Sequence, residues 1–147
     1  MIINKDFRDF IGCLNKHKVE YLIVGGYAVA LHGHPRYTKD LDVFINITID
    51  NAQKLVDAII DFGFSSLQLN VNDFTEPGNI IQLGYPPNRI DLITSATGLE
   101  FDQAWPARIV IDIEGLDVNF IDLEHLIRNK RATGRYQDLA DIENLSG

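Results

Sequence analysis

The chain has 147 residues, of which 46% are hydrophobic and 23% are charged, an ordinary composition for one soluble globular domain over residues 1–147. The 13 basic and 21 acidic residues give a net charge of −8, which argues against broad, nonspecific nucleic-acid binding. Cys13 is the single cysteine, no apolar run has the length of a membrane span, and the N-terminal residues do not resemble a signal peptide, so we expect a cytoplasmic protein without membrane association.

The first half of the chain alternates helical and strand patterns. Apolar residues recur at helical spacing near the N-terminus, and the run VEYLIV before two glycines is typical of a buried strand. The expected elements of this half are a helix over 4–16, a strand over 19–26, a short helix over 27–33, a strand over 41–47 and a helix from 48 or 50 to 63.

The second half contains two hairpin signals, Pro86-Pro87-Asn88 and Glu114-Gly115, each between two apolar runs. The expected elements are a strand over 66–71, a loop over 72–79, strands over 80–85 and 89–95, a helical piece near 99–104, strands over 108–113 and 116–121, and helices over 123–132 and 136–145. Because strict strand–helix alternation ends after residue 79, we predict an α/β domain of the α+β type. Its sheet is mixed and partly antiparallel, and helices flank it.

Three carboxylates occupy similar positions on two of the predicted strands. Asp40 and Asp42 share one strand face about 7 Å apart, while the leucine and valine next to Asp42 point into the core. Asp91 lies between Ile90 and Leu92 in the same manner. If the two strands are neighbours, Asp91 lies within about 5 Å of one of the other two acids.

Such a cluster has two interpretations. The acids are either solvated charges at strand ends, which the short Asp-x-Asp pattern often marks, or they are metal ligands. At an effective dielectric near 20 each close pair costs on the order of 3 kcal/mol, which a bound divalent cation offsets. Carboxylate ligands without cysteine favour Mg²⁺ or Mn²⁺, and three of them can hold two ions about 3.5–4 Å apart.

Gly25 and Gly26 stand between a predicted strand and a predicted helix. The backbone amides at such a position carry partial positive charge and suit a triphosphate. Two glycines are also typical of a simple tight turn between a strand and a helix, and the residues alone leave both possibilities open.

These residues, taken together, resemble the signature of the DNA polymerase beta-like nucleotidyltransferase superfamily, and most closely its small bacterial members related to AbiEii-type proteins. The matching positions of the first motif are Gly25, Gly26, Ala28, His32, Gly33, Arg36, Thr38, Asp40, Leu41 and Asp42. The segment RIDLI is similar to the strand with that superfamily's third acid. The segment LIRNKRATGRYQDLADIENL is similar to a common C-terminal segment, with Lys130, Arg135, Asp138 and Asp141 at matching places.

The resemblance implies a minimal nucleotidyltransferase fold and a role for each matching residue. Gly25 and Gly26 would embrace the phosphates of an NTP substrate. Asp40 and Asp42 would bind two Mg²⁺ (or Mn²⁺) ions, and Asp91 would complete the metal site and help to deprotonate the acceptor. The remaining implied contacts are those of Lys130 and Arg135 with the triphosphate and those of Arg36 and Thr38 within the phosphate loop. Tyr27 follows the two glycines, and the Gly-Ser pair found in much of the superfamily is absent.

The main functional hypothesis is therefore a metal-dependent nucleotidyltransferase. It would transfer an NMP group from an NTP to an acceptor and release pyrophosphate. The acceptor would be an RNA such as tRNA, a protein or a small-molecule hydroxyl. The alternative is a non-catalytic partner protein of the same fold in a toxin–antitoxin or defence system. A glycosyltransferase of the Asp-x-Asp kind is a third hypothesis, which 147 residues make less favourable.

Overall fold

The strands of the computed structural model, which describes residues 3–33, 39–64, 67–85 and 87–146, form an open six-stranded sheet in the order β3-β4-β2-β1-β6-β5. Their bounds are Tyr21–Val24 for β1, Leu41–Ile45 for β2, Ile80–Leu83 for β3, Ile90–Ile93 for β4, Ile109–Ile113 for β5 and Leu116–Phe120 for β6. Two neighbouring pairs, β2–β4 and β1–β6, are parallel, and the other three are antiparallel. The predicted mixed sheet of an α+β domain is confirmed, as are both hairpins.

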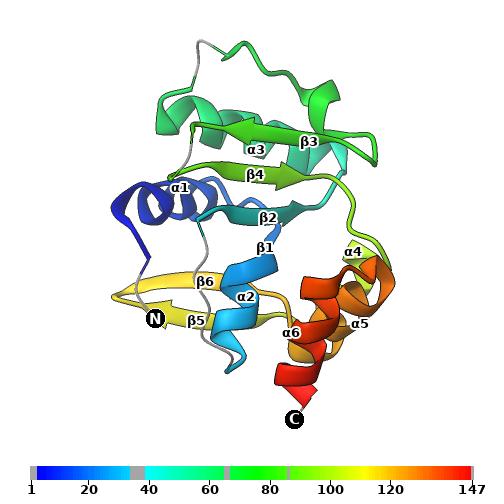
Figure 1. Ribbon diagram of the computed structural model, residues 1–147. Coiled ribbons are helices and arrows are strands. Elements are labelled where there is room, and N and C mark those ends of the chain that lie inside the picture. The colour runs from blue at the N-terminus through cyan, green and yellow to red at the C-terminus, as the bar shows by residue number, and fades with distance from the viewer. Residues whose placement is uncertain (1–2, 34–38, 65–66, 86, 147) are drawn as a thin grey trace.

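Helices cover the two faces of this sheet. Their bounds are Lys5–Lys16 for α1, Gly25–Leu31 for α2, Ile49–Phe62 for α3, Phe101–Ala104 for α4, Leu123–Thr133 for α5 and Tyr136–Ser146 for α6. Figure 1 shows α1 and α3 together behind the sheet, while α2 crosses in front of it. Helices α5 and α6 pack against each other at one end of the molecule. None of the helices within the described residues has both the length and the apolar character needed to cross a membrane.

Local chemistry explains where the longer helices begin and end. The side chain of Asn4 accepts a hydrogen bond from Phe7 N and caps α1, and Thr48 caps α3 in the same way through Asn51 N. Gly63 ends α3 in the left-handed conformation, with φ of 117°. The apolar stripes of α1 and α3 then pack together and fix one side of the core.

The predicted strand over 66–71 is wrong. Within its described part, residues 67–71, the backbone is not extended into the sheet, and Val71–Phe74 form a short 3₁₀-helix, η2. Gln68 has a φ of 54°, and Asn70 and Asp73 form a reciprocal capping box at the start of η2. Side-chain bonds to the backbone therefore override the alternating pattern.

Candidate active site

The two strands with the acidic residues lie side by side. Strands β2 and β4 are parallel, and their register places Asp42 opposite Asp91 and Leu41 opposite Ile90. Residues opposite each other in a parallel pair point to the same face, so the carboxylates of Asp42 and Asp91 share a face of the sheet. The prediction that these two strands are neighbours is confirmed.

Asp40 directly precedes β2 and is joined to Asp91 by a basic residue that the sequence analysis did not single out. Arg89 Nη2 donates to Asp40 Oδ2 at 2.7 Å, and Arg89 Nε donates to Asp91 Oδ1 at 3.0 Å. A third bond of 3.2 Å joins Nη2 to Asp91 Oδ2. One signal could have revealed Arg89: it lies two positions before Asp91, the spacing that places two residues on one face of an extended chain.

Asp42 sits in an environment that disfavours its charge. Its pKa is raised to about 6, first because the carboxyl is buried and then because the charges of Asp91 and Asp40 lie nearby. The positive charges of Lys130 and Arg89 act in the opposite direction. The carboxylate end of the sheet therefore has an unfavourable concentration of negative charge that a cation would relieve.

Gly25 stands directly beside Asp42. It follows Val24, which is the partner of Asp42 in the antiparallel β1–β2 pair, and its φ is 68°. A Cβ atom built on Gly25 would overlap Asp42 Oδ2, so only glycine leaves room for this carboxylate. Gly26 is buried in the first turn of α2. Helix α2 thus starts two residues earlier than the predicted helix over 27–33.

A pocket of about 580 Å³ opens next to Gly25 and Asp42. Its lining comes partly from the sheet and the loops that flank β3 and β4, and partly from α5 and from Arg135 in the connection between α5 and α6. Lys130 and Arg135, the two cations predicted to contact a triphosphate, both line it. The structure therefore brings one predicted metal ligand, one predicted phosphate-binding glycine and both predicted cations to the same cavity.

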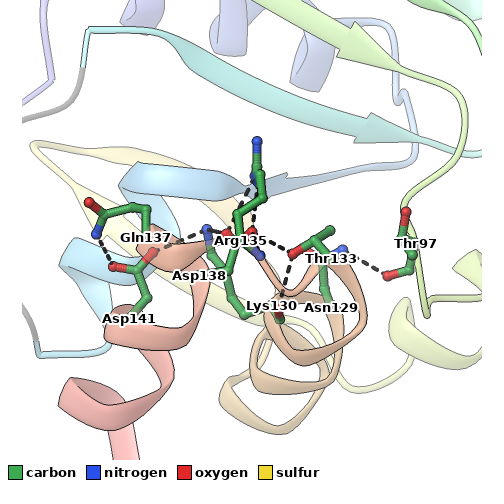
Figure 2. A network of polar contacts seen from close by, with 8 residues as sticks. All are labelled: Thr97, Asn129, Lys130, Thr133, Arg135, Gln137, Asp138 and Asp141. Carbon is green, nitrogen blue, oxygen red and sulfur yellow. Dashed lines mark hydrogen bonds and ion pairs between the residues drawn. The ribbon is translucent and has the colours of Figure 1, made fainter.

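Lys130 and Arg135 belong to a polar network that joins α5 to α6, shown in Figure 2. Lys130 Nζ lies 3.1 Å from Asp138 Oδ1 and 3.3 Å from Asp141 Oδ2, and all three residues are at most 5% exposed. Arg135 Nε donates to Asp138 Oδ2 at 2.7 Å, while its side chain remains 75% exposed. In Figure 2 the guanidinium of Arg135 points away from the two helices, toward the sheet.

The positive and negative side chains of this network stabilise each other's charged forms. Burial by itself would raise the pKa of Asp138, but hydrogen bonds from Arg135, Thr133 and Lys130 and the charge of Lys130 hold it well below its usual range. The pKa of Arg135 is raised chiefly by its hydrogen bond to Asp138, and the charge of Asp42 contributes as well. Arg135 therefore interacts electrostatically with both the network and the carboxylate cluster.

Two further predicted residues, Arg36 and Thr38, lie outside the described residues. Within the part of the chain that is described, no group of three or more His, Cys, Asp or Glu side chains is arranged to hold a metal ion as it stands. The donor chemistry is nevertheless of the kind that Mg²⁺ and Mn²⁺ prefer: Asp42 and Asp91 lie opposite each other on adjacent strands, Asp40 directly precedes β2, and Gly25 leaves room for the Asp42 carboxylate. The contacts of Arg89 with Asp40 and Asp91 engage oxygens that such an ion would need.

A mixed sheet with paired acids on adjacent strands, beside a pocket with a glycine turn and two cations, is the arrangement that the resemblance of the sequence to nucleotidyltransferases implies. The family comparison agrees. Residues 4–146 match the family described as "Nucleotidyltransferase of unknown function (DUF6036)", and the chain belongs to that family.

Solved structures share the fold. An antigenic nucleotidyltransferase-like protein from Paracoccidioides brasiliensis is 22% identical, with a TM-score of 0.56 over 94% of this chain and 72% of that one. The lincosamide antibiotic adenylyltransferase LnuA, in a lincomycin-bound structure, is 15% identical, with a TM-score of 0.57 over 99% of this chain and 98% of its own. A putative nucleotidyltransferase from Thermotoga maritima is 15% identical, with a TM-score of 0.57 over 95% and 86% of the two chains.

No curated protein matches the chain. The expected membership of the nucleotidyltransferase superfamily is confirmed, and nucleotidyl transfer is the general activity that the family supports. The closer relation to AbiEii-type proteins stays a prediction.

Proposed function

We propose that this chain is a metal-dependent nucleotidyltransferase that transfers an NMP group from an NTP to an acceptor hydroxyl and releases pyrophosphate. The observation that carries the proposal is the position of Asp42. It lies opposite Asp91 on adjacent parallel strands, and it lines a pocket that Lys130 and Arg135 also line. A site that binds a metal–triphosphate complex needs both carboxylates to hold the metal ions and positive side chains to contact the phosphates.

Asp40, Asp42 and Asp91 would hold the Mg²⁺ or Mn²⁺ ions. When bound, these ions neutralise charge on the reacting phosphate and align the attacking and leaving oxygens. Gly25 has no Cβ, which leaves room for the carboxylate of Asp42 beside the backbone amides that we propose to bind the nucleotide phosphates. Gly26 is proposed to support the same turn.

The other residues of the site would have distinct roles in the transfer reaction. The acceptor oxygen attacks the α-phosphorus and the bond to the pyrophosphate oxygen breaks, while the hydroxyl proton passes to Asp91. Arg135, with its exposed side chain, contacts the departing phosphates, and Lys130 adds positive charge from the pocket wall. Arg36 and Thr38 are proposed to hold the loop before β2 around the nucleotide.

The acceptor defines the range of substrates to test. LnuA is a lincosamide antibiotic adenylyltransferase, and its similarity covers 99% of this chain, which supports a small molecule as one acceptor class. An RNA such as tRNA and a protein hydroxyl are the other two classes. Purified protein should be incubated with labelled ATP, CTP, GTP or UTP and each acceptor class, and the products analysed by mass spectrometry.

Calorimetry with each NTP and Mg²⁺ tests the proposal directly. We expect binding of at least one NTP and release of pyrophosphate. Asp42→Asn should reduce turnover by at least about a thousandfold, because a metal ligand contributes on the order of several kcal/mol to the stabilisation of the transition state. The matched control is Asp57→Asn on α3, where the carboxylate is exposed and accepts a bond from Gln53.

The control variant should keep full activity. If no NTP binds the wild-type protein with either metal, the proposed function is wrong. Purification with a stoichiometric partner protein and no turnover would favour the alternative, a non-catalytic partner in a toxin–antitoxin or defence system.

A further inference from the structure

The guanidinium of Arg89 forms a bridge between two of the three carboxylates. It bonds to Asp40 Oδ2 at 2.7 Å and to both oxygens of Asp91, at 3.0 and 3.2 Å. The side chain of Arg89 is 29% exposed and that of Asp91 is 13% exposed, so the bridge is only partly shielded from water. Charge-assisted, forked bonds of this kind are among the stronger hydrogen bonds in proteins.

Arg89 experiences the charge of the whole cluster. Its pKa is raised first by the hydrogen bond to Asp91 and then by the charges of Asp91, Asp40 and Asp42, while burial opposes this. An arginine does not lose its proton at physiological pH, so it cannot leave the cluster by becoming neutral. Any second cation that uses the same oxygens must displace the guanidinium physically.

We propose that Arg89 is a built-in counter-cation of the carboxylate cluster, which holds Asp40 and Asp91 together before a divalent cation binds and competes with that cation for their oxygens. This inference rests on the proposed function, because it assumes that Asp40, Asp42 and Asp91 bind metal. It assigns Arg89 a positioning role, and it explains how three carboxylates can share one end of the sheet in the metal-free protein.

Competition between Arg89 and a divalent cation predicts the direction of two measurable changes, one in stability and one in metal affinity. In the metal-free protein Arg89 lowers the repulsion between Asp40 and Asp91, so it stabilises the fold. During metal binding the same contacts must be given up, so they weaken the affinity of the cluster for a divalent cation. A merely structural arginine would contribute to the first effect and leave the second unchanged.

Mn²⁺ binding without nucleotide, followed by electron paramagnetic resonance, measures the second effect. We expect Arg89→Gln to tighten Mn²⁺ binding by about tenfold, because a charge-assisted contact no longer competes for the carboxylate oxygens. Arg89→Lys keeps the charge but not the forked geometry, so its change should be smaller. The control is Arg128→Gln, which removes the same charge from an exposed, 3.7 Å ion pair with Glu124.

Thermal unfolding with EDTA and with Mg²⁺ gives an independent measure. Arg89→Gln should unfold at a lower temperature than the wild type in EDTA, and Mg²⁺ should raise its midpoint by more than it raises that of the wild type. If Arg89→Gln does not fold, the same two measurements on Arg89→Lys decide the question.

The outcomes separate this inference from the proposed function. Unchanged or weaker Mn²⁺ binding in the folded Arg89 variants overturns the counter-cation role. The proposed function stands in that case, provided that Asp42→Asn abolishes the Mn²⁺ binding of the wild type. A wild-type protein that binds no Mn²⁺, alone or with an NTP, overturns both.

Discussion

Two charged clusters each contribute side chains to the lining of the same pocket, and they differ in charge balance and in burial. The carboxylate cluster consists of Asp40, Asp42 and Asp91 around the guanidinium of Arg89. The helix network sets Lys130 and Arg135 against Asp138 and Asp141. The first has an excess of negative charge within the set, whereas in the second the positive and negative side chains are equal in number.

The pKa values of one aspartate in each cluster shift in opposite directions. The pKa of Asp42 is raised to about 6 by burial and by like charges. The pKa of Asp138 is lowered, against the effect of its burial, by its bonds to Arg135, Thr133 and Lys130. A cluster that is unfavourable as it stands is suited to binding a ligand, and a cluster whose charges are satisfied is suited to holding two helices together.

The largest effect that we predict concerns the helix network. Lys130→Met leaves Asp138 and Asp141 without their ammonium partner, and both are at most 1% exposed. Breaking a buried pair by removing one partner should lower the free energy of unfolding by about 3–5 kcal/mol, as urea denaturation would measure.

Lys5→Met is the matched control for this variant. Lys5 also pairs with an aspartate, Asp9, but its side chain is 85% exposed, so Lys5→Met should leave the free energy of unfolding nearly unchanged. Equal losses in the two variants would contradict the view that the helix network is a structural unit.

The next effect concerns the contact of Gly25 with Asp42 in the carboxylate cluster. Gly25→Ala places a methyl group where Asp42 Oδ2 lies and also requires alanine to adopt a φ of 68°. We expect a stability loss of about 2–3 kcal/mol from strain and overlap together. Turnover should fall about a hundredfold, because small displacements of a site residue have effects of that size.

Gly115→Ala separates strain from overlap. Gly115 has a φ of 86° in the β5–β6 turn, and a Cβ atom there would meet nothing within 4 Å. This variant should lose stability through strain alone and retain its activity. If Gly25→Ala retains activity as well, the close approach of Gly25 to Asp42 has no functional importance.

The opposite pKa shifts also predict opposite pH effects on stability in the metal-free protein. Asp42 has a raised pKa in the folded state, so the folded state binds more protons than the unfolded state between about pH 4 and 6, and its contribution makes the protein more stable as the pH falls from 7 to 5. Asp138 has a lowered pKa, so its stabilising contribution is present above about pH 4 and is lost as the pH falls below that.

Urea denaturation in EDTA between pH 3 and 8 would measure both slopes. We expect a gain of about 1–2 kcal/mol between pH 7 and 5 that Asp42→Asn abolishes, after allowance for the partial exposure of this carboxyl. A gain of the same size in Asp42→Asn would assign the effect to another group.

Much of the fold could be predicted because it is encoded locally. The Glu114-Gly115 turn forms as predicted, and short-range caps at Asn4, Thr48 and Asp122 begin three helices close to their predicted starts. The failure at residues 66–71 is local too. Alternation predicts a strand there, but the capping box of Asn70 and Asp73 satisfies the backbone in another way.

The candidate site is harder to predict because its partners are distant in the sequence. Asp42 and Asp91 could be placed near each other only through the assumption that β2 and β4 pair, which the register confirms. The local spacing places Arg89 on the same face as Asp91, but its bridge to Asp40 spans 49 positions and depends on the pairing of β2 with β4. The burial of Lys130 by α6 likewise depends on how two helices pack, which helical periodicity does not determine.

The smallest effect on stability is predicted for Arg135, the member of the helix network whose pKa is also raised by the charge of Asp42. Arg135 bonds to Asp138, yet its side chain is 75% exposed, so Arg135→Gln should lower the free energy of unfolding by no more than about 1 kcal/mol.

The effect of Arg135→Gln on nucleotide binding should be larger. Loss of a guanidinium–phosphate contact should weaken NTP affinity by about tenfold in calorimetry. Arg128→Gln, which removes the same charge from an exposed pair with Glu124, should leave that affinity unchanged. If Arg135→Gln is instead strongly destabilised and its NTP affinity is unchanged, Arg135 has a structural role like that of Lys130. The proposed contact of Arg135 with the phosphates would then be wrong.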